Sequence, residues 1–118
     1  MNILVVDNKP GELNHTVNCL KSLYPQALLI PFEDAMDAVR YGYNHPVDVL
    51  YTEVTMRHIT GFDVVRLLRK KHPEVRAFFI SDSEEYLKLS IQNGGKGYYL
   101  KPVDAESLLH GNRITGTA

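Results

Sequence analysis

One apolar stretch has the length and composition of a buried strand: Val47-Asp48-Val49-Leu50-Tyr51-Thr52-Glu53-Val54-Thr55-Met56. Pro46 precedes it and polar residues follow it, a pattern typical of a central parallel strand that helices cover on both faces. Parallel α/β sheets bind ligands at the carboxyl ends of their strands. Glu53 lies where this strand ends, so it is the first candidate functional residue.

The rest of the chain alternates between strand and helix patterns. Further apolar runs predict strands at residues 3–6, 27–30, 77–80 and 98–100. Apolar residues at helical spacing predict helices over residues 10–23, 35–44, 62–71 and 83–91, with a short last helix after Asp104. Strict alternation with short connections predicts an α/β fold, a doubly wound (βα)5 three-layer sandwich around a five-stranded parallel sheet.

At 118 residues the chain is expected to form one domain. We place this domain at residues 1–110, because Gly111 interrupts the last helical pattern and residues 112–118 have no periodicity. Residues 111–118 are expected to be a tail, either the truncated end of the last helix or a disordered segment.

Composition excludes several classes of protein. A net charge of -1 gives no electrostatic reason to expect binding to nucleic acid or to a membrane surface. Cys19 is the single cysteine, so an internal disulfide is excluded, and no Cys/His cluster has the spacing of a zinc site. The apolar N-terminus is too short for a signal peptide, and no run reaches the length of a membrane span. We therefore expect a cytoplasmic protein.

Polar residues follow four of the five predicted strands. They are Asp7 and Asn8 after the first, Glu53 at the third, Ser81 after the fourth and Lys101 after the fifth. Because these strand ends share one edge of the sheet, their side chains are expected to meet there. Oxygen ligands suit Mg²⁺, and a lysine suits a phosphoryl group, so the pattern predicts phosphoryl binding or transfer. Taken singly, each residue has a simpler explanation, since strands commonly end in polar loops.

The sequence resembles the CheY-like receiver domain of two-component response regulators, from Ile3 to about Leu109. The matching pieces are Val5-Val6-Asp7-Asn8, Asp48-Val49-Leu50-Tyr51-Thr52-Glu53 with Met56 and Gly61, Phe79-Ile80-Ser81, and Gly97-Tyr98-Tyr99-Leu100-Lys101-Pro102-Val103. The run from Ser83 to Val103 is most similar to receivers that precede a LytTR-type DNA-binding domain. The resemblance implies the flavodoxin-like strand order 2-1-3-4-5.

The resemblance also implies roles for the residues at the strand ends. Asp7, Asn8 and Glu53 match the positions that hold Mg²⁺, and Glu53 matches the residue that accepts a phosphoryl group from a histidine kinase. Ser81 and Lys101 match the residues that contact the phosphate. Tyr98, in the fifth strand, matches the aromatic residue of the family's conformational switch, and Ser81 is the second switch residue. The peptide bond before Pro102 is implied to be cis.

Several positions at this edge depart from the family pattern. Asn8 replaces an acidic residue, Asp82 replaces a small one, Arg57 replaces a proline, and Glu53 replaces the usual aspartate. The extra methylene of Glu53 moves its carboxylate by about 1.5 Å, and a misplacement of about 1 Å can cost 10²-fold in rate. The departures predict a degenerate pseudo-receiver with a weak or absent Mg²⁺ site, a regulatory module rather than an enzyme.

Three alternatives stay open from the sequence. In the first, Glu53 reaches toward Lys101, either as an imitation of a phosphorylated aspartate or as a purely structural ion pair. In the second, Glu53 is a working, Mg²⁺-dependent phospho-acceptor. The third alternative is a flavodoxin-like carrier of a nucleotide or flavin, which the acidic loop of residues 7–11 disfavours because Pro10 removes an amide donor.

The partners implied by the resemblance are a histidine kinase and an attached or separate effector, in keeping with transcription regulation. A homodimer is expected to use the face formed by the fourth helix, the fifth strand and the fifth helix, where Tyr86, Leu89 and Tyr98 could line a patch. The domain itself has no basic stripe and no helix-turn-helix pattern, so it is not expected to bind DNA.

Overall fold

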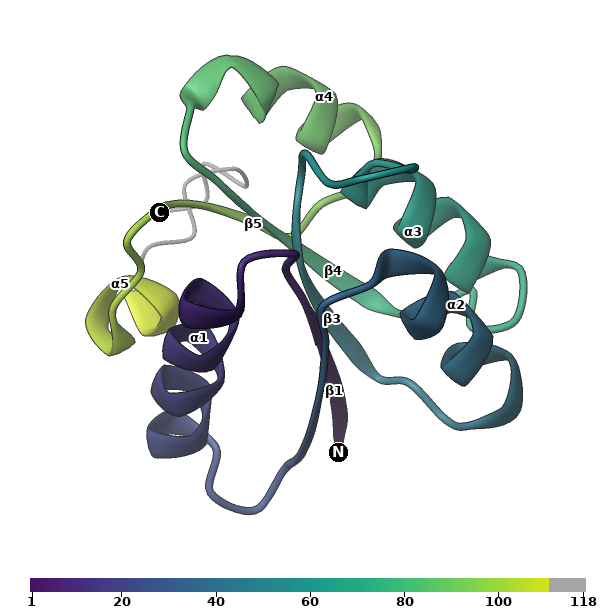
Figure 1. Cartoon of the computed structure of the whole chain (residues 1–118), viewed down its shortest axis with the longest axis horizontal. Coiled ribbons are helices and arrows are strands. Elements are labelled where there is room, and N and C mark those ends of the chain that lie inside the picture. The colour runs from purple at the N-terminus through teal and green to yellow at the C-terminus, as the bar shows by residue number, and fades with distance from the viewer. Residues whose placement is uncertain (111–118) are drawn as a thin grey trace.

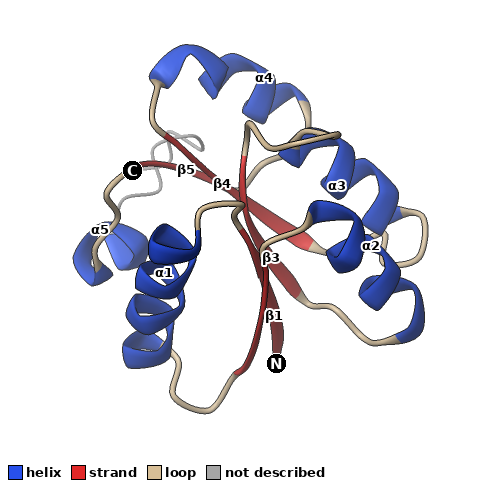
Figure 2. Ribbon diagram, viewed as in Figure 1, coloured by secondary structure: helices blue, strands red, loops and turns tan. Residues whose placement is uncertain are grey.

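The computed structural model describes residues 1–110, which form a parallel sheet of five strands between two layers of helices (Figures 1 and 2). The strands are β1 (Asn2–Val6), β2 (Leu28–Phe32), β3 (Val49–Glu53), β4 (Arg76–Ser81) and β5 (Gly97–Leu100). The helices are α1 (Pro10–Leu23), α2 (Ala35–Asn44), α3 (Gly61–Arg69), the 3₁₀ turn η1 (Glu84–Tyr86), α4 (Leu87–Gln92) and α5 (Ala105–His110). The predicted tail, 111–118, lies outside the described residues.

The strand order is β2-β1-β3-β4-β5, which confirms the predicted fold class and topology. β1 pairs with β2 on one side and with β3 on the other, so the chain reverses its winding direction between β1 and β3. In sheets of this kind, ligands bind in the crevice that this reversal opens at the carboxyl ends of the strands. None of the helices within residues 1–110 combines the length and hydrophobicity that a membrane crossing requires.

Each face of the sheet has its own hydrophobic core. α1 and α5 cover one face, and α2, α3 and α4 cover the other (Figure 1). In β1, Ile3 and Val5 pack into the core on the α1 side, whereas Leu4 and Val6 pack into the opposite core. β3 is buried along its whole length, as the continuous apolar pattern predicts for a strand covered on both faces. Glu53 is therefore held at the end of the most enclosed strand.

The loop after Glu53 is fixed by the start of α3. Thr60 and Asp63 form a capping box, in which each side chain accepts a hydrogen bond from the other residue's backbone N–H. The amide of Gly61 also donates to the carbonyl of Val54 at 2.8 Å. A Cβ at Gly61 would lie 2.3 Å from the carbonyl oxygen of Glu53, so this close approach requires glycine. These contacts fix the backbone between Glu53 and the start of α3.

The region of α4 differs most from the sequence prediction. Instead of one helix over 83–91, a 3₁₀ turn precedes a helix of six residues. Gly94 ends this segment in a left-handed conformation, with a φ of 73°. The guanidinium of Arg69 in α3 donates to the carbonyls of Asn93 at 2.6 Å and Gly94 at 3.2 Å. A contact from α3 therefore supports the end of α4, which is too short to be stable from local sequence alone.

The two edges of the sheet are β2 and β5. β2 carries Pro31, which pairs in register with Val5 of β1 but has no N–H to present on the open side. β5 is the shortest strand, and Pro102 follows it two residues after Leu100. One edge strand, β2, is thus interrupted by a proline, and the other, β5, is short.

Tyr99 is expected to make the stability of the fold decrease at alkaline pH. Its ring is buried beside Phe78 and Tyr51, and burial raises the pKa of Tyr99 to about 12. Because this pKa lies above the ordinary value of 10.0, the stabilisation is present below pH 10 and is lost as the pH rises through the folded pKa. Between pH 9 and pH 11, we expect the free energy of unfolding to fall by about 1 kcal/mol more for the native protein than for the Tyr99→Phe variant.

Urea unfolding of both proteins at pH 9 and pH 11 measures this difference. The comparison between the two proteins removes the contribution of other groups that titrate in the same range. Equal losses in both would show that the Tyr99 phenol does not contribute.

Candidate functional site

Three charged residues from different strands meet at the carboxyl edge of the sheet. Asp7 follows β1, Glu53 ends β3, and Lys101 follows β5. Asp7 and Glu53 are only 2% and 3% exposed, so both carboxylates depend on partners within the protein. The positions of these residues at strand ends predict that their side chains converge, and the structure brings them into contact.

The ammonium group of Lys101 is the centre of this cluster. Its Nζ lies 2.9 Å from Oδ2 of Asp7 and forms ion pairs with Oε1 of Glu53 and Oε1 of Glu12. Three carboxylates thus surround one cation. The Lys101, Asp7 and Glu53 side chains are 7%, 3% and 3% exposed, so their pairs are largely protected from water and salt, whereas Glu12 is 41% exposed and approaches from the solvent side.

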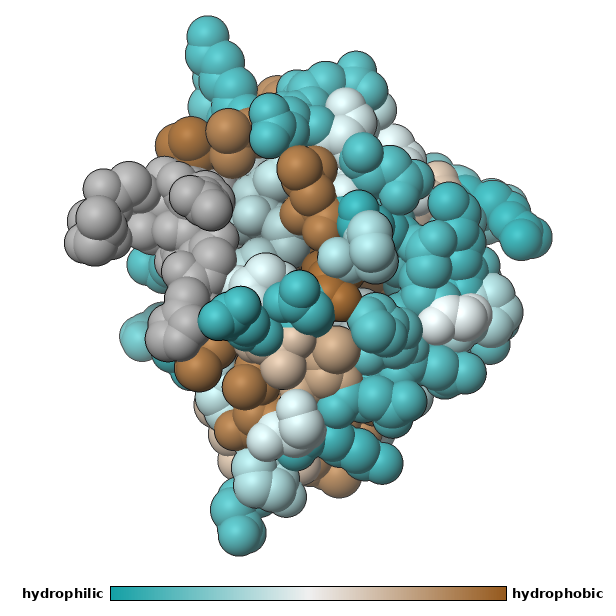
Figure 3. All heavy atoms as spheres, turned by 90° about the vertical axis from the view of Figure 1, so that its left-hand side faces the viewer, coloured by the Kyte–Doolittle hydropathy of each residue, from teal (hydrophilic) through white to brown (hydrophobic). Residues whose placement is uncertain are grey.

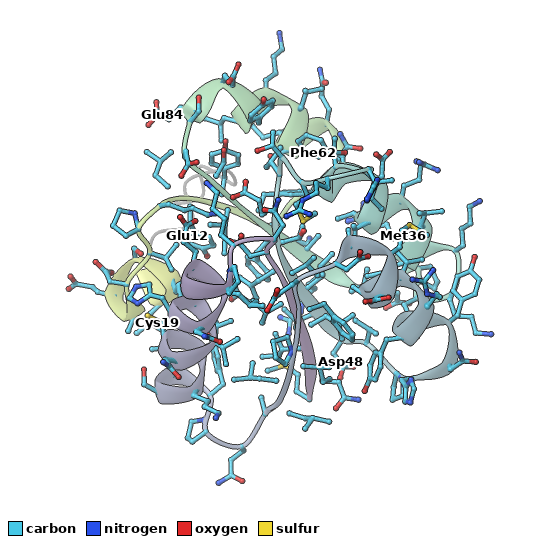
Figure 4. The ribbon with its side chains drawn as sticks, viewed as in Figure 1. Glu12, Cys19, Met36, Asp48, Phe62 and Glu84 are labelled. Carbon is cyan, nitrogen blue, oxygen red and sulfur yellow. The ribbon has the colours of Figure 1, made fainter. Side chains whose placement is uncertain are left out.

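Glu12 is the member of the cluster that strand-end reasoning does not find. It comes from the first turn of α1 and lies near the N-terminal end of that helix, beside the strand ends (Figure 4). The sequence signal for it is general: an acidic residue in a first helical turn is favoured by the helix dipole. That it also reaches Lys101 depends on how α1 docks on the sheet.

Both oxygens of the Glu53 carboxylate are engaged. Oε1 pairs with Lys101, and Oε2 accepts hydrogen bonds from the backbone amides of Val54 at 2.8 Å and Thr55 at 3.3 Å. The backbone here is fixed in turn, because the Val54 amide also lies 3.1 Å from the carbonyl of Ile80 in β4. The carboxylate is therefore held in one orientation by groups on two sides.

The surroundings of Lys101 favour its charged form. Burial alone would lower the pKa of Lys101, but the carboxylates of Glu12, Glu53 and Asp7 outweigh this effect and hold the pKa above its usual range. The ammonium therefore stays charged through the physiological range. The cluster is an ion pair network with a permanent cation at its centre.

Ser81 and Tyr98, the two predicted switch residues, are tied to the loop after β4. Ser81 is buried, and its Oγ accepts a hydrogen bond from the amide of Ser83 at 3.2 Å. Tyr98 is also buried, and its hydroxyl donates to the carbonyl of Ser83. Burial raises the pKa of the Tyr98 phenol, so the hydroxyl remains a donor. Both side chains thus hold the segment that leads into η1.

The remaining candidate residues lie around the cluster. Asp82 is exposed and pairs with Lys9 at 3.5 Å, and the peptide bond between Lys101 and Pro102 is cis. Asn8 lines a separate pocket at the same edge, together with Glu33, Asp34, Ala35, Met56, Arg57 and His58. His58 has a φ of 74°, a left-handed conformation that is uncommon outside glycine.

The carboxylates of Asp7, Glu12 and Glu53 are the ligand type that Mg²⁺ prefers, and one oxygen of each lies within 4.8 Å of the others. Mg²⁺ binds oxygen at about 2.0–2.1 Å. An ion bound to all three would occupy the position of the Lys101 ammonium, which already contacts each of them. With Lys101 in place, these residues do not fit a magnesium ion.

A parallel sheet of order 2-1-3-4-5, with an acidic cluster and a lysine at its carboxyl edge, is the architecture of a CheY-like receiver. The family model for the response regulator receiver domain matches residues 3–112. The chain belongs to this family of two-component signalling domains, which bind Mg²⁺ at such acidic clusters and are in general not enzymes.

Curated relatives include several regulators. The chain is 29% identical over 84 residues to the transcriptional regulatory protein DegU of Brevibacillus brevis, covering 70% of this chain and 36% of DegU. It is 25% identical over 112 residues to the sensory transduction protein LytT of Enterococcus faecalis, covering 92% of this chain and 45% of LytT. The chain therefore spans less than half the length of either relative.

Solved receiver structures share the fold. A CheY-like response regulator receiver domain protein from Methanospirillum hungatei superposes with a TM-score of 0.80 at 20% identity, covering 93% of this chain and 88% of that one. The chemotaxis response regulator CheY4 of Vibrio cholerae also gives 0.80, at 21% identity and 93% of both chains. At these identities the likeness concerns the fold alone.

Proposed function

We propose that this chain is a pseudo-receiver, a receiver domain that signals without accepting a phosphoryl group at Glu53. The observation that carries the proposal is the bonding of the Glu53 carboxylate. One oxygen is paired with Lys101, and the other accepts from two backbone amides. An acceptor must present a free oxygen in line with the phosphodonor, and neither oxygen of Glu53 is free in this arrangement.

The length of the Glu53 side chain supports the same proposal. The extra methylene carries the carboxylate to the ammonium of Lys101, the residue that matches the family's phosphate contact. The carboxylate thus takes a partner that a phosphorylated aspartate would use, with one negative charge in place of about two. On this proposal the domain is held in one signalling state, similar to the activated state of a phosphorylated receiver.

The partner is proposed to be an effector domain, attached or separate, that regulates transcription in the cytoplasm. Relatives that are transcriptional regulators and are longer than this chain support the idea. A kinase would serve as a docking partner rather than as a phosphodonor. Leu89, Ile91, Leu100 and Leu109 expose apolar side chains on α4, β5 and α5, and Figure 3 shows hydrophobic groups on this side of the molecule. We propose this face for effector docking or homodimer formation.

The proposal is tested by incubating the protein with Mg²⁺ and a small acyl phosphate, then recording the intact mass. We expect no mass gain for the native protein. The double variant Glu53→Asp, Asn8→Asp shortens the acceptor and restores the second acidic residue, and we expect it to gain one phosphoryl group. Glu53→Gln, which has no carboxylate, serves as the matched control.

A gain of one phosphoryl group by the native protein, lost in Glu53→Gln, would overturn the proposal and identify a working acceptor. If the double variant also stays inert, the Glu53 and Asn8 substitutions are not the cause, and Arg57 and Asp82 become the residues to restore.

A further inference from the structure

We infer that the ammonium group of Lys101 is the resident cation of this site and that it excludes divalent metal ions from Asp7, Glu12 and Glu53. The inference concerns the site of the proposed pseudo-receiver and deepens that proposal. It goes beyond the loss of a charge at Asn8, because it assigns the exclusion to a positive group already present. Glu12, which no strand-end pattern identifies, is the third carboxylate of the arrangement.

The positions of the carboxylate oxygens leave no room for a metal ion beside the ammonium. Each of the three carboxylates directs one oxygen at Nζ of Lys101. One oxygen of each carboxylate also lies within 4.8 Å of the others, so the three residues enclose the space that a small cation would need. The ammonium and a magnesium ion are thus alternatives for one position, and the ammonium is covalently held there.

The other carboxylate oxygens of Asp7 and Glu53 are also engaged. Oδ1 of Asp7 accepts from the amide of Lys9 at 3.0 Å. Oε2 of Glu53 accepts from the amides of Val54 and Thr55. Turning either carboxylate toward a metal beside Lys101 would break these hydrogen bonds, which is costly because hydrogen bonds to a charged acceptor are stronger than those between neutral groups.

Electrostatic repulsion also opposes a second cation at this site. A metal ion beside the cluster would meet the repulsion of the Lys101 ammonium, whose side chain is only 7% exposed and is therefore weakly screened. When the ammonium is removed, three carboxylates at short range remain with no cation among them. The same geometry that excludes a metal from the native protein should then bind one.

The inference is tested by titrating Mn²⁺, a spin-active substitute for Mg²⁺, into the native protein and the Lys101→Met variant, and following free Mn²⁺ by electron spin resonance. Methionine has a similar length and no charge. We expect Lys101→Met to bind one Mn²⁺ at least about tenfold more tightly than the native protein, because one repelling charge is removed. Excess Mg²⁺ should displace the bound Mn²⁺.

Two controls locate the effect. Lys9→Met removes one positive charge at the same edge, but Lys9 pairs with the exposed Asp82 outside the cluster, so no gain in Mn²⁺ affinity is expected. Adding Glu12→Gln to Lys101→Met removes the third ligand and should abolish most of the gain. A similar gain in Lys9→Met would mean that net charge alone is responsible and would overturn the inference.

The test stays informative if Lys101→Met is unfolded without metal, because a metal that binds only the folded state must then refold it. Circular dichroism with and without Mg²⁺ measures this. A variant that neither binds Mn²⁺ nor refolds overturns the inference, as does tight binding by the native protein. No phosphodonor is used, so this result and the phosphorylation result can fail independently.

Discussion

Replacing Lys101 with methionine is expected to lower the free energy of unfolding by about 3–5 kcal/mol in metal-free buffer at neutral pH. Asp7 and Glu53 are 2% and 3% exposed, and both lose their cationic partner in this variant. A buried carboxylate without a partner must be desolvated at high cost or take up a proton. Urea unfolding followed by circular dichroism measures the loss.

The matched control is again Lys9→Met. Its partner Asp82 is exposed, and pairs in water contribute at most about 1 kcal/mol. Adding Glu53→Gln to Lys101→Met removes one of the stranded charges and should recover part of the stability. If Lys101→Met is no less stable than Lys9→Met, the cluster does not need its ammonium, and the central role given to Lys101 is wrong.

Replacing Phe79 with alanine is expected to cost about 3–5 kcal/mol, because the ring is fully buried and its loss leaves a cavity. Phe79 lies in β4, with its ring centroid 4.9 Å from that of Phe62 in α3. A Cβ at Gly95 would lie 2.9 Å from the Phe79 ring, so the chain after α4 also rests on it. The cavity would therefore loosen α3 and α4 together.

Phe78 is the matched control, since it is the neighbouring residue and points to the opposite face of the sheet. It is partly exposed and stacks on Tyr51 at a centroid distance of 4.7 Å. Phe78→Ala should therefore lower the unfolding free energy by clearly less than Phe79→Ala, measured under the same conditions. Equal losses would show that the core on the α3 side is not packed as tightly as the structure indicates.

Most of the fold follows from the sequence, because alternation of apolar strands and amphipathic helices leaves few topologies open. The strand order needed the family resemblance. β2 ends at Phe32, two residues beyond the predicted end at Ile30, because Pro31 and Phe32 continue the pairing with Val5 and Val6 of β1. The break before α4 was not predicted, since it depends on tertiary contacts such as that of Arg69 with the carbonyls that end α4.

Some residues of the candidate site are predictable from the sequence, and others depend on tertiary contacts. Asp7, Glu53 and Lys101 follow strands, and the geometry of a parallel sheet brings strand ends together whatever the helices do. Glu12 belongs to a helix, so its distance from Lys101 depends on how α1 is rotated and docked. Asn8 follows Asp7 directly, yet its side chain lines the neighbouring pocket, because successive residues at a strand end point in different directions.

The prolines near the sheet edges bear on how copies of this domain can meet. An open strand edge is a template on which a second chain can extend the sheet, and this is a common start of aggregation. Pro31 interrupts the donors of β2, and β5 offers only four residues before the chain turns away toward Pro102. Self-association by strand addition is thereby disfavoured, so the proposed homodimer would have to rest on contacts between side chains.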